Sequence, residues 1–379
     1  MNILFVLENY HPHIGGVESV FQGLAEGLAA RGHRVTLVTR RLPATAKQEV
    51  LRGVRIIRAA SFGSRHWFTF TAFPAALRWA RWADIVHTTT YNGAPPAWLA
   101  ARIFRKPAVI TVHEALGPRW ATLADVSRPA AWLYRTFERM ILRLGFARYA
   151  AVSRSTARQL LQIVRAKHRR SVQVVYNGLD YGLWRRQPAA AARLRRRFSL
   201  AGRFVGLFYG RPGVSKGLEV LLRALPLIVQ AIPSFHLVAI VSEDRAYHAR
   251  AQRLRSLADQ LGMRDHVLFL SPRPRRELPA YVAMADCVVV PSLSEGFGFA
   301  VAEACAIGKI VVASNTDSIP EVVSGKWLLF DAGSPLKLAE AVVDVYYGRY
   351  HRTRLRRFSI KQNIKNYLKA YSNAISHGA

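Results

Sequence analysis

Two carboxylates on either side of a glycine-rich segment are the residues whose types and spacing best suit chemistry. Glu295 and Glu303 have residues 296–302 between them, and the apolar run 287–292 precedes them. A buried strand, a glycine turn and the start of a helix aim free backbone N–H groups and a positive helix end at an anion. A carboxylate further along the helix accepts hydrogen bonds from hydroxyl groups. The segment therefore predicts a site for a molecule with a central phosphate and hydroxyl groups at both ends, such as a nucleotide-sugar.

Two cations lie in a second short loop of the same half of the chain. Arg211 and Lys216 follow the apolar run 204–209, so they stand at the carboxyl end of an expected strand. An arginine side chain forks onto phosphate oxygens, and a lysine ammonium is a compact point charge. The loop lacks the residue order of a P-loop. The proline and glycines that flank both charges nevertheless favour a phosphate cradle over two solvated cations.

The N-terminal half contributes a glycine pair and a histidine. Gly15 and Gly16 follow the first expected strand, where a backbone without Cβ atoms can approach a ligand closely, and an ordinary tight turn is the alternative. His113 ends another apolar run, residues 108–112. It suits a hydrogen bond to a sugar hydroxyl or to a departing phosphate, and a purely structural histidine is the alternative.

Short apolar runs that read as strands alternate with amphipathic segments along almost the whole chain. The expected strands are 3–7, 35–39, 84–87, 108–112, 147–153, 172–176, 204–209, 236–241, 267–270, 288–290, 310–313 and 327–330, and the expected helices include 17–30, 217–231, 249–262 and 358–371. This alternation predicts an α/β protein with parallel sheets covered by helices on both faces. Ligand sites are then expected at the carboxyl ends of the strands.

The length of 379 residues is sufficient for two domains, each with a hydrophobic core. The strand-and-helix pattern breaks at Asn177-Gly178 and Asp180, and a polar stretch rich in alanine and arginine continues to Phe198. We predict the inter-domain linker there. Two doubly wound domains that face each other across a cleft are the simplest architecture.

The composition shows a strong positive charge and few cysteines. The formal net charge of +32 favours attraction to polyanions: nucleic acid, anionic lipid or phosphorylated substrates. Cys287 and Cys305 lie in apolar patterns, so we expect two small buried side chains, which fits a reducing compartment. No signal peptide is recognisable, and no apolar run approaches the roughly 20 residues of a spanning helix. We expect a soluble protein or one that lies on a membrane surface.

Several classes of site have no motif in the sequence. There is no Asp-x-Asp pair, no Cys/His cluster with zinc spacing and no Gly-x-Ser-x-Gly elbow. The first strand is not followed by Gly-x-Gly-x-x-Gly, which disfavours a dinucleotide cofactor. We therefore predict no metal and no cofactor.

Taken in order, these segments resemble the retaining glycosyltransferases of family 4, which have the GT-B fold of two Rossmann-like domains. The resemblance covers nearly the whole chain. It rests on Gly15-Gly16-Val17-Glu18, residues 28–33, His113, Asn177-Gly178 with Asp180, Gly210-Arg211 with Lys216-Gly217, and Glu295 with Glu303. It implies an acceptor-binding domain at 1–180, a domain for the nucleotide-sugar at 181–357, and a C-terminal helix at 358–379 that crosses back to the N-terminal domain.

The resemblance also implies a role for each site residue. Arg211 and Lys216 would hold the diphosphate of the donor and stabilise the charge that develops on the leaving group. Glu295 would bind hydroxyls of the donor sugar, and Glu303 those of the ribose. The remaining residues implied in donor binding are Gly15, Gly16, Gly210, Gly296, Phe297, Gly298, Phe299 and Ala300, the last three through backbone N–H groups. His113 would contact the sugar near its O6.

The implied reaction is the transfer of a hexose with retention of anomeric configuration and without a metal. The leaving phosphate takes the acceptor's proton in a same-face, oxocarbenium-like displacement. We expect GDP-mannose as donor, with UDP-glucose and UDP-N-acetylglucosamine as alternatives, and a lipid-linked or glycan acceptor. The sequence departs from the family at residues 314–321, which lack the usual glycine pair, and at Tyr176, where proline is usual.

Two segments interleave aromatic and arginine side chains, residues 65–82 and 132–143. Basic amphipathic helices with Trp and Phe suit an anionic membrane surface, which predicts a cytoplasmic protein peripheral to the inner face of the membrane. The alternative is that the aromatic rings face the core.

A basic nucleic-acid-binding protein is the competing class, but no nucleic-acid-reading motif is present. Among enzymes, a phosphorylase or epimerase of related architecture is the second candidate.

Overall fold

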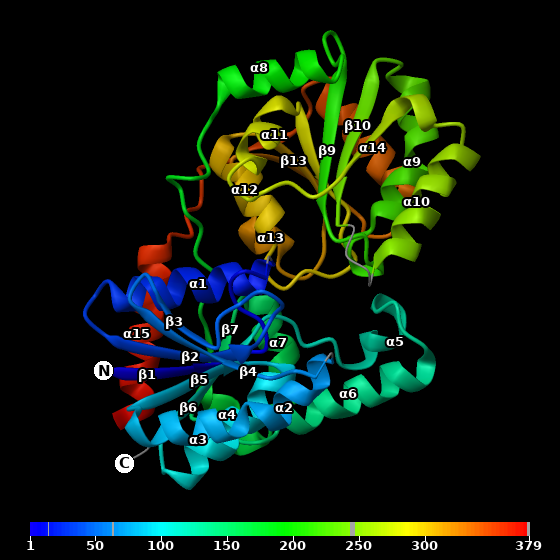
Figure 1. Cartoon of the computed structure of the whole chain (residues 1–379). Helices are drawn as coiled ribbons and strands as arrows, with labels where there is room; N and C mark the ends of the chain where they lie inside the picture. The colour runs from blue at the N-terminus through cyan, green and yellow to red at the C-terminus, as the bar shows by residue number, and fades with distance from the viewer. Residues whose placement is uncertain (14, 63, 243–246, 377–379) are drawn as a thin grey trace. The chain divides into compact units, whose positions relative to one another are not determined.

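The computed structural model describes residues 1–13, 15–62, 64–242 and 247–376 of the chain. Its internal contacts divide the chain into two compact units. Unit 1 comprises Met1–Trp120, Arg128–Gly178 and Phe358–Ala379, and unit 2 comprises Ala121–Ser127 and Leu179–Arg357. Each unit contains one β-sheet with helices on both of its faces (Figure 1).

The sheet of unit 1 has eight strands in the order β3-β4-β2-β1-β5-β6-β7-β8. The strands are β1 Asn2–Val6, β2 Arg34–Arg40, β3 Gln48–Leu51, β4 Val54–Ala59, β5 Ile85–Thr89, β6 Ala108–Val112, β7 Arg148–Ala151 and β8 Val172–Val174. All neighbours pair in parallel except β3, which is antiparallel to β4. Because β2 and β5 lie on opposite sides of β1, the strand order reverses between β1 and β5, which is where α/β folds bind ligands.

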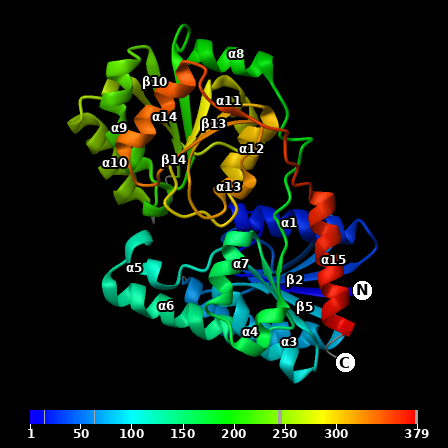
Figure 2. The same ribbon diagram turned by 180° about the vertical axis from the view of Figure 1, so that it is seen from behind.

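The helices of unit 1 cover a sheet that is apolar on both faces. They are α1 Gly16–Ala29, α2 Phe68–Thr71, α3 Phe73–Trp82, α4 Ala94–Ile103, α6 Arg128–Leu142, α7 Arg154–Leu161 and α15 Ile360–Ser376, and α5 Trp120–Leu123 spans the boundary between the units. Alternate β1 side chains enter two cores: Ile3 and Phe5 pack with α1 and α15, and Leu4 packs with α3 and α4. Figures 1 and 2 show α15 beside α1, although the two are far apart in sequence.

The sheet of unit 2 has seven strands in the order β11-β10-β9-β12-β13-β14-β15. The strands are β9 Phe204–Gly210, β10 Phe235–Val241, β11 Val267–Leu270, β12 Cys287–Val290, β13 Ile310–Ser314, β14 Lys326–Phe330 and β15 His351–Arg352. Only β15 is antiparallel to its neighbour. The order reverses at β9, so the switch point of this sheet lies between β9 and β12.

The helices of unit 2 also form two layers. They are α8 Pro188–Arg197, α9 Leu218–Ala231, α10 His248–Gln260, α11 Leu278–Met284, α12 Phe299–Ile307, α13 Ile319–Val322 and α14 Pro335–Tyr346. Helices α9, α10 and α14 share one core with the sheet, whereas α11 contacts α8 and α12 (Figures 1 and 2).

The structure confirms every predicted strand, with ends shifted by a few residues, and adds β3, β4 and β15. The chain passes from unit 1 to unit 2 at Gly178–Leu179, within the predicted break, but the predicted linker does not extend to Phe198, because residues 188–197 form α8, which packs on α11. Arg195 anchors this helix: its guanidinium donates to the Met284 carbonyl oxygen at 2.7 Å and to Asp286 Oδ2 at 2.6 Å. These partners are distant in sequence, so the local composition could not reveal the packed helix.

Candidate active site

The carboxyl ends of β9 and β12 carry the two loops that sequence analysis singled out in unit 2. The strands are neighbours, so the loops that follow them meet at the edge of the sheet. The Ser215 carbonyl oxygen accepts hydrogen bonds from the amides of Leu293 at 2.8 Å and Ser294 at 3.3 Å. The structure therefore joins the predicted cation loop to the predicted carboxylate loop at the switch point.

Lys216 and Glu295 form an ion pair between these loops. The Lys216 ammonium lies 2.7 Å from Glu295 Oε2, and the Ser292 hydroxyl donates to the same oxygen at 3.1 Å. Asp317 holds the Glu295 backbone, because its Oδ2 accepts from the Glu295 amide at 3.2 Å and from the Ser294 hydroxyl at 2.7 Å. Asp317 lies in the loop that departs from the family pattern, and its role as a support was not evident from sequence.

The geometry at the start of α9 requires glycine at position 217. Its φ of 67° lies in the left-handed region, and a Cβ atom there would overlap the Pro291 carbonyl oxygen of the neighbouring loop. Any larger residue must move one of the two loops. The close approach of these backbones thus keeps Lys216 against Glu295.

The glycine turn after Glu295 ends at a helix N-terminus, as predicted. Gly298 is the N-cap of α12, with a φ of 88°. The amides of the first helical turn, including those of Phe299 and Ala300, have no carbonyl partner within the helix, so they form an anion-binding end. Phe297 is buried and packs edge-on against Phe299 at 5.1 Å between ring centroids. Its aromatic side chain therefore supports the turn, and Gly296 lies in the same turn.

Glu303 belongs to a separate polar network one turn into α12. Tyr209 donates a hydrogen bond to its Oε2 at 3.0 Å, and Arg275 donates to its Oε1 at 3.2 Å. Burial raises the pKa of Glu303 to about 7, and the Arg275 charge and the Tyr209 hydrogen bond oppose this rise. The two glutamates therefore have different partners and do not form an acid–base couple.

Arg275 is a site residue that sequence reasoning missed. It follows β11 in the segment 272–276, and its guanidinium lies 5.9 Å from the ring centroids of both Trp184 and Phe299. Its position after a strand of the parallel sheet was the signal that could have identified it. Gly210, which ends β9 with a φ of 154°, and the exposed Arg211 complete the loop with Lys216.

The glycine pair of unit 1 opens helix α1. Gly15 is its N-cap and Gly16 its first residue, and a Cβ atom on Gly15 would overlap the Glu18 carboxylate. That carboxylate lies 3.2 Å from His13 Nδ1. Ile14 of the same predicted loop lies outside the described residues.

His113 follows β6 in unit 1, and its ring packs edge-on against Phe21 with 5.9 Å between centroids. Its Nε2 atom is inaccessible to solvent and has no hydrogen-bond partner in the described part of the chain. Burial lowers the pKa of His113 to about 4, with Glu18 opposing. The ring is therefore neutral at pH 7 and can hydrogen-bond a ligand without carrying charge.

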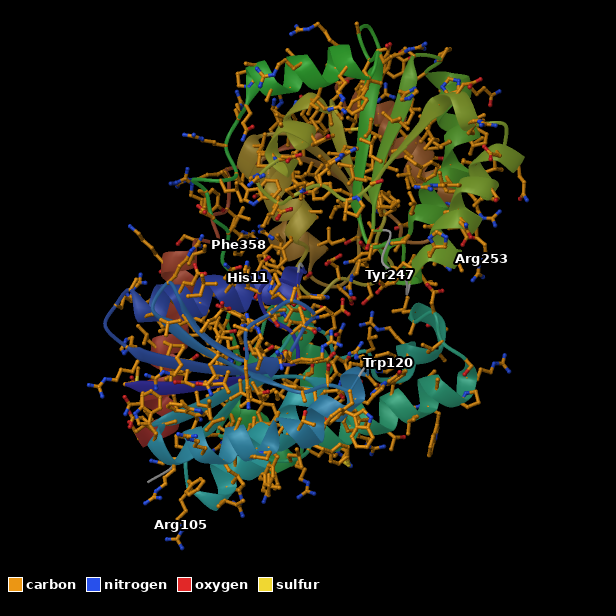
Figure 3. All side chains as sticks on the ribbon, viewed as in Figure 1. His11, Arg105, Trp120, Tyr247, Arg253 and Phe358 are labelled. Carbon is orange, nitrogen blue, oxygen red and sulfur yellow. The ribbon has the colours of Figure 1, made fainter. Side chains whose placement is uncertain are left out.

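Glu138 on α6 supports the chain that follows His113 and was also missed. Its carboxylate accepts hydrogen bonds from the amides of Leu116 at 3.0 Å and Gly117 at 2.8 Å, and burial raises its pKa. Trp120, labelled in Figure 3, stacks on Tyr134 with 5.3 Å between ring centroids. Isolated acidic and aromatic residues on an amphipathic helix give no sequence signal for such a role.

The predicted site residues thus fall into two groups. Unit 1 contains Gly15, Gly16 and His113, and unit 2 contains Gly210, Arg211, Lys216, Glu295, Gly296, Phe297, Gly298, Phe299, Ala300 and Glu303. Across the described ranges, no group of three or more His, Cys, Asp or Glu residues is placed to hold a metal ion. The same ranges contain no helix long and apolar enough to cross a membrane.

Comparison with known proteins places both halves of the chain in glycosyltransferase families. The family described as Glycosyl transferases group 1 matches residues 193–370, and Glycosyltransferase Family 4 matches residues 14–183. A D-inositol 3-phosphate glycosyltransferase of Thermomonospora curvata is 32% identical over 326 residues, or 79% of this chain and 74% of that protein. An uncharacterized glycosyltransferase of Methanocaldococcus jannaschii is 28% identical over 352 residues, covering 86% of this chain and 85% of that protein.

Solved structures show the same fold at low sequence identity. Anabaena HepE in complex with UDP has a TM-score of 0.78 and 20% identity, over 98% of this chain and 100% of that chain. Sucrose-phosphate synthase from Thermosynechococcus elongatus has a TM-score of 0.76 and 20% identity, over 100% and 98% of the two chains. The chain therefore belongs to the group 1 glycosyltransferases of the family 4 type, and it is a glycosyltransferase with the two-domain α/β architecture of the GT-B fold.

Proposed function

We propose that this glycosyltransferase moves a hexose from a nucleoside diphosphate sugar to a hydroxyl acceptor with retention of configuration. The observation that carries the proposal is the meeting of Lys216, Glu295 and the N-terminus of α12 at one switch point. These groups supply a cation and free amides for the diphosphate, and a carboxylate that accepts hydrogen bonds from sugar hydroxyls. A sugar diphosphate requires partners of these kinds.

The leaving diphosphate is stabilised by charges that belong to the chain. Lys216, Arg211 and the amides of Phe299 and Ala300 face the negative charge that develops when the glycosidic bond breaks. Glu295 orients a sugar hydroxyl, and its ion pair keeps Lys216 in place before the donor arrives. The departing phosphate oxygen accepts the proton of the attacking hydroxyl on the same face, so no side-chain nucleophile is needed.

Glu303 is the proposed handle for the ribose hydroxyls, and His113 for the donor sugar. Glu303 lies beside Arg275 and Tyr209, which hold its carboxylate in one orientation. The neutral His113 ring offers Nε2 to a sugar hydroxyl. Both roles are binding roles, because in the proposed mechanism the departing phosphate oxygen takes the proton and neither Glu303 nor His113 transfers one.

Among donors we place UDP-glucose and UDP-N-acetylglucosamine ahead of GDP-mannose, the donor expected from sequence. HepE was solved with UDP and with UDP-glucose, and the relatives include several D-inositol 3-phosphate glycosyltransferases. The name of these relatives adds a phosphorylated cyclitol, D-inositol 3-phosphate, to the lipid-linked and glycan acceptors to be tested.

A thermal-shift panel with UDP, GDP, ADP and their sugars tests which nucleotide the protein binds, because a ligand that binds the folded state raises the melting temperature of the protein. We expect the uridine compounds to give the largest shift, and Lys216→Ala and Glu303→Gln to reduce it. Arg193→Gln, on the exposed surface of α8, is the matched control. An unchanged shift in both site variants contradicts the assignment. The anomeric configuration of the product, read by NMR, tests retention.

We also propose that unit 1 lies on the cytoplasmic face of an anionic membrane. Trp132 and Leu133 on α6 are 66% and 59% exposed, and Arg128, Arg135 and Arg139 are exposed on the same helix. Trp132 stands four residues after Arg128 and three before Arg135, so these side chains share one helix face. Aromatic rings next to arginines suit the lipid headgroup region.

The other predicted membrane segment divides between core and surface. Trp79 and Trp82 pack against the core of unit 1, which is the alternative stated for residues 65–82. Phe70, in contrast, is 69% exposed and its ring contacts that of exposed Trp67.

Vesicle flotation tests membrane binding through α6. We expect the parent to float with anionic vesicles at low salt and Trp132→Ser/Leu133→Ser to remain in solution. Equal flotation of both proteins, or none by the parent, contradicts membrane binding through α6.

A further inference from the structure

Unit 2 has a basic surface pocket at the end of the sheet opposite the donor loops. The donor loops follow the carboxyl ends of β9 and β12, whereas this pocket lies where β13 and β14 begin. We call it the basic pocket: its volume is about 350 Å³, and its lining includes Arg186, Ile307, Gly308, Lys326, Arg352 and Thr353. None of its ten lining residues is acidic.

Two of the cations are placed directly opposite each other. Lys326 on β14 and Arg352 on β15 are Cα partners in an antiparallel pair. Like charges at opposite positions of such a pair repel and destabilise it. Strand β15 has only two residues, so this repulsion acts on one of the shortest strand pairings of the unit. Arg352 also donates from Nη2 to the Tyr350 hydroxyl at 3.0 Å, and an anion between Lys326 and Arg352 would offset the repulsion between their charges.

The third cation is held in a fixed orientation. Arg186 donates from Nε to the Ile307 carbonyl oxygen at 3.1 Å. A Cβ atom on Gly308 would lie 2.9 Å from Arg186 Nη2, so the absence of a side chain there leaves room for the guanidinium. An arginine anchored through Nε still presents its terminal nitrogens, the geometry that suits two oxygens of a phosphate.

The electrostatic setting of a neighbouring lysine agrees with this concentration of charge. Burial is the main cause that lowers the pKa of Lys309, and the charges of Arg195, Arg186 and Lys326 lower it further, against the opposing effect of Asp286. Asp286 is already bound to Arg195 at 2.6 Å. Asp286 therefore offsets the charge of Arg195, and the three pocket cations have no acidic residue among the pocket lining.

We propose that the basic pocket binds a small phosphate-bearing anion through Arg186, Lys326 and Arg352. The volume suits a phosphomonoester or pyrophosphate group with a small substituent, because ligand pockets begin at about 300 Å³. The site is distinct from the donor site, yet both involve α12. Residues Cys305–Gly308 at the carboxyl end of this helix line the pocket, so the three cations must outweigh the negative partial charge of that helix end, whereas its amino end carries the proposed diphosphate-binding amides.

Inorganic pyrophosphate is the probe, titrated by calorimetry into the full chain with Lys216→Ala, which removes the main cation of the donor loop. We expect this protein to bind pyrophosphate, and the added changes Lys326→Gln and Arg352→Gln to weaken binding by at least about tenfold, since each removes a charge-assisted hydrogen bond. The matched control carries Arg193→Gln and Arg196→Gln on α8, which remove the same charge outside the pocket. It should bind as the Lys216→Ala protein does.

Melting temperature separates a binding role from a structural one. Without phosphate, Lys326→Gln/Arg352→Gln in an otherwise unchanged chain should melt no lower than the parent, because the exchange removes a repulsion. Pyrophosphate should raise the melting temperature of the parent and of the α8 control more than that of the pocket variant. A pocket variant that melts several degrees lower without phosphate, or equal pyrophosphate affinity in all proteins, overturns the proposal.

A lipid headgroup offers the same phosphate chemistry, so vesicles form a second arm. Flotation with phosphatidic acid vesicles is compared for the parent, the pocket variant and the α8 control. We expect the pocket variant to float as the α8 control does while losing pyrophosphate binding. If the pocket variant alone stops floating and free pyrophosphate fails to bind, the surface serves a membrane and the small-anion proposal is wrong.

Discussion

At the residue scale, the burial of Glu303 predicts a pH dependence of donor binding, if the residue has its proposed role. Burial raises its pKa to about 7, so the carboxylate changes charge near neutral pH. In the proposed role, the ionised carboxylate would accept hydrogen bonds from the ribose hydroxyls, and the protonated form would lose one acceptor. The effect of pH on folding stability has the opposite direction. The pKa of Glu303 in the folded protein exceeds that of an unfolded Glu, so protonation favours the folded state and the free energy of unfolding falls as pH rises through about 7.

We therefore expect the affinity for the uridine-diphosphate sugar to rise about tenfold between pH 6 and pH 8, as the ionised fraction of Glu303 rises. Calorimetric titration of the sugar nucleotide measures this, because its diphosphate diester does not titrate in that range. In Glu303→Gln the affinity should be lower and independent of pH. The same pH dependence in the variant would assign the effect to another group.

A second residue-scale prediction concerns Gly217. In Gly217→Ala the new Cβ would overlap the Pro291 carbonyl oxygen at a φ of 67°, so the two donor loops must separate. We expect loss of donor binding and a lower melting temperature. Gly213→Ala is the control in the same loop: its φ is −66°, and its nearest neighbour is a Tyr247 ring atom at 3.9 Å. Similar donor affinity in the two variants would show that the loop tolerates the overlap.

At the element scale, α15 is joined to the sheet of unit 1 by buried hydrogen bonds. The Tyr371 hydroxyl lies 2.6 Å from His87 Nδ1, and the Tyr367 hydroxyl lies 2.8 Å from Thr111 Oγ1. Thr111 Oγ1 is also 2.8 Å from His87 Nε2, so both helix tyrosines belong to one network. Burial lowers the pKa of His87 to about 3, and its ring is neutral at physiological pH.

Tyr371→Phe would remove a hydroxyl and leave His87 Nδ1 buried without its partner. We expect a loss of about 1–3 kcal/mol in the free energy of unfolding, the usual cost of an unsatisfied buried polar group. Ser372→Ala, on the exposed side of the same helix, should change stability by less than about 0.5 kcal/mol. Denaturant unfolding measures both, and equal stability of the two variants would show that α15 is held by apolar packing alone.

At the scale of the whole molecule, the net charge of +32 opposes folding through self-repulsion. Many of the cations extend from the surface, such as Arg105 of unit 1 and Arg253 of unit 2 (Figure 3). Only part of this charge has a proposed use: Lys216 and Arg211 in the donor loop, the arginines of α6 at a membrane surface, and the cations of the basic pocket. Some of the remainder is buried and paired, such as Arg58 with Glu49, and the cations on exposed faces are screened by salt.

We expect the melting temperature to rise as sodium chloride increases from about 20 mM to about 0.5 M, because the Debye length then falls well below 10 Å. Differential scanning fluorimetry measures the change, and sucrose at matched osmolality is the control for general solvent effects. A melting temperature that falls with salt would show that favourable ion pairs outweigh the repulsion.

The sequence predicted the parts of the site that depend on local pattern. The glycine turn before α12 and the cation loop after β9 are recognisable because each joins an apolar run to an amphipathic one. The partners of the site residues were not predictable in this way. Asp317, Arg275 and Glu138 act through contacts with residues distant in the chain, and of the three only Arg275 has a local signal, its position after β11.

By itself, the sequence determined the alternation of strands and helices, the order of the motifs and hence the fold and the family, because these depend on residues close together in the chain. Only the tertiary structure decided that Glu295 pairs with Lys216, 79 residues away, and that Glu303 pairs with Tyr209, 94 residues away. It also decided that residues 188–197 form a packed helix and that Lys326 faces Arg352. The physical reason is that such contacts follow from strand order and register, which bring distant segments together and which no local pattern specifies.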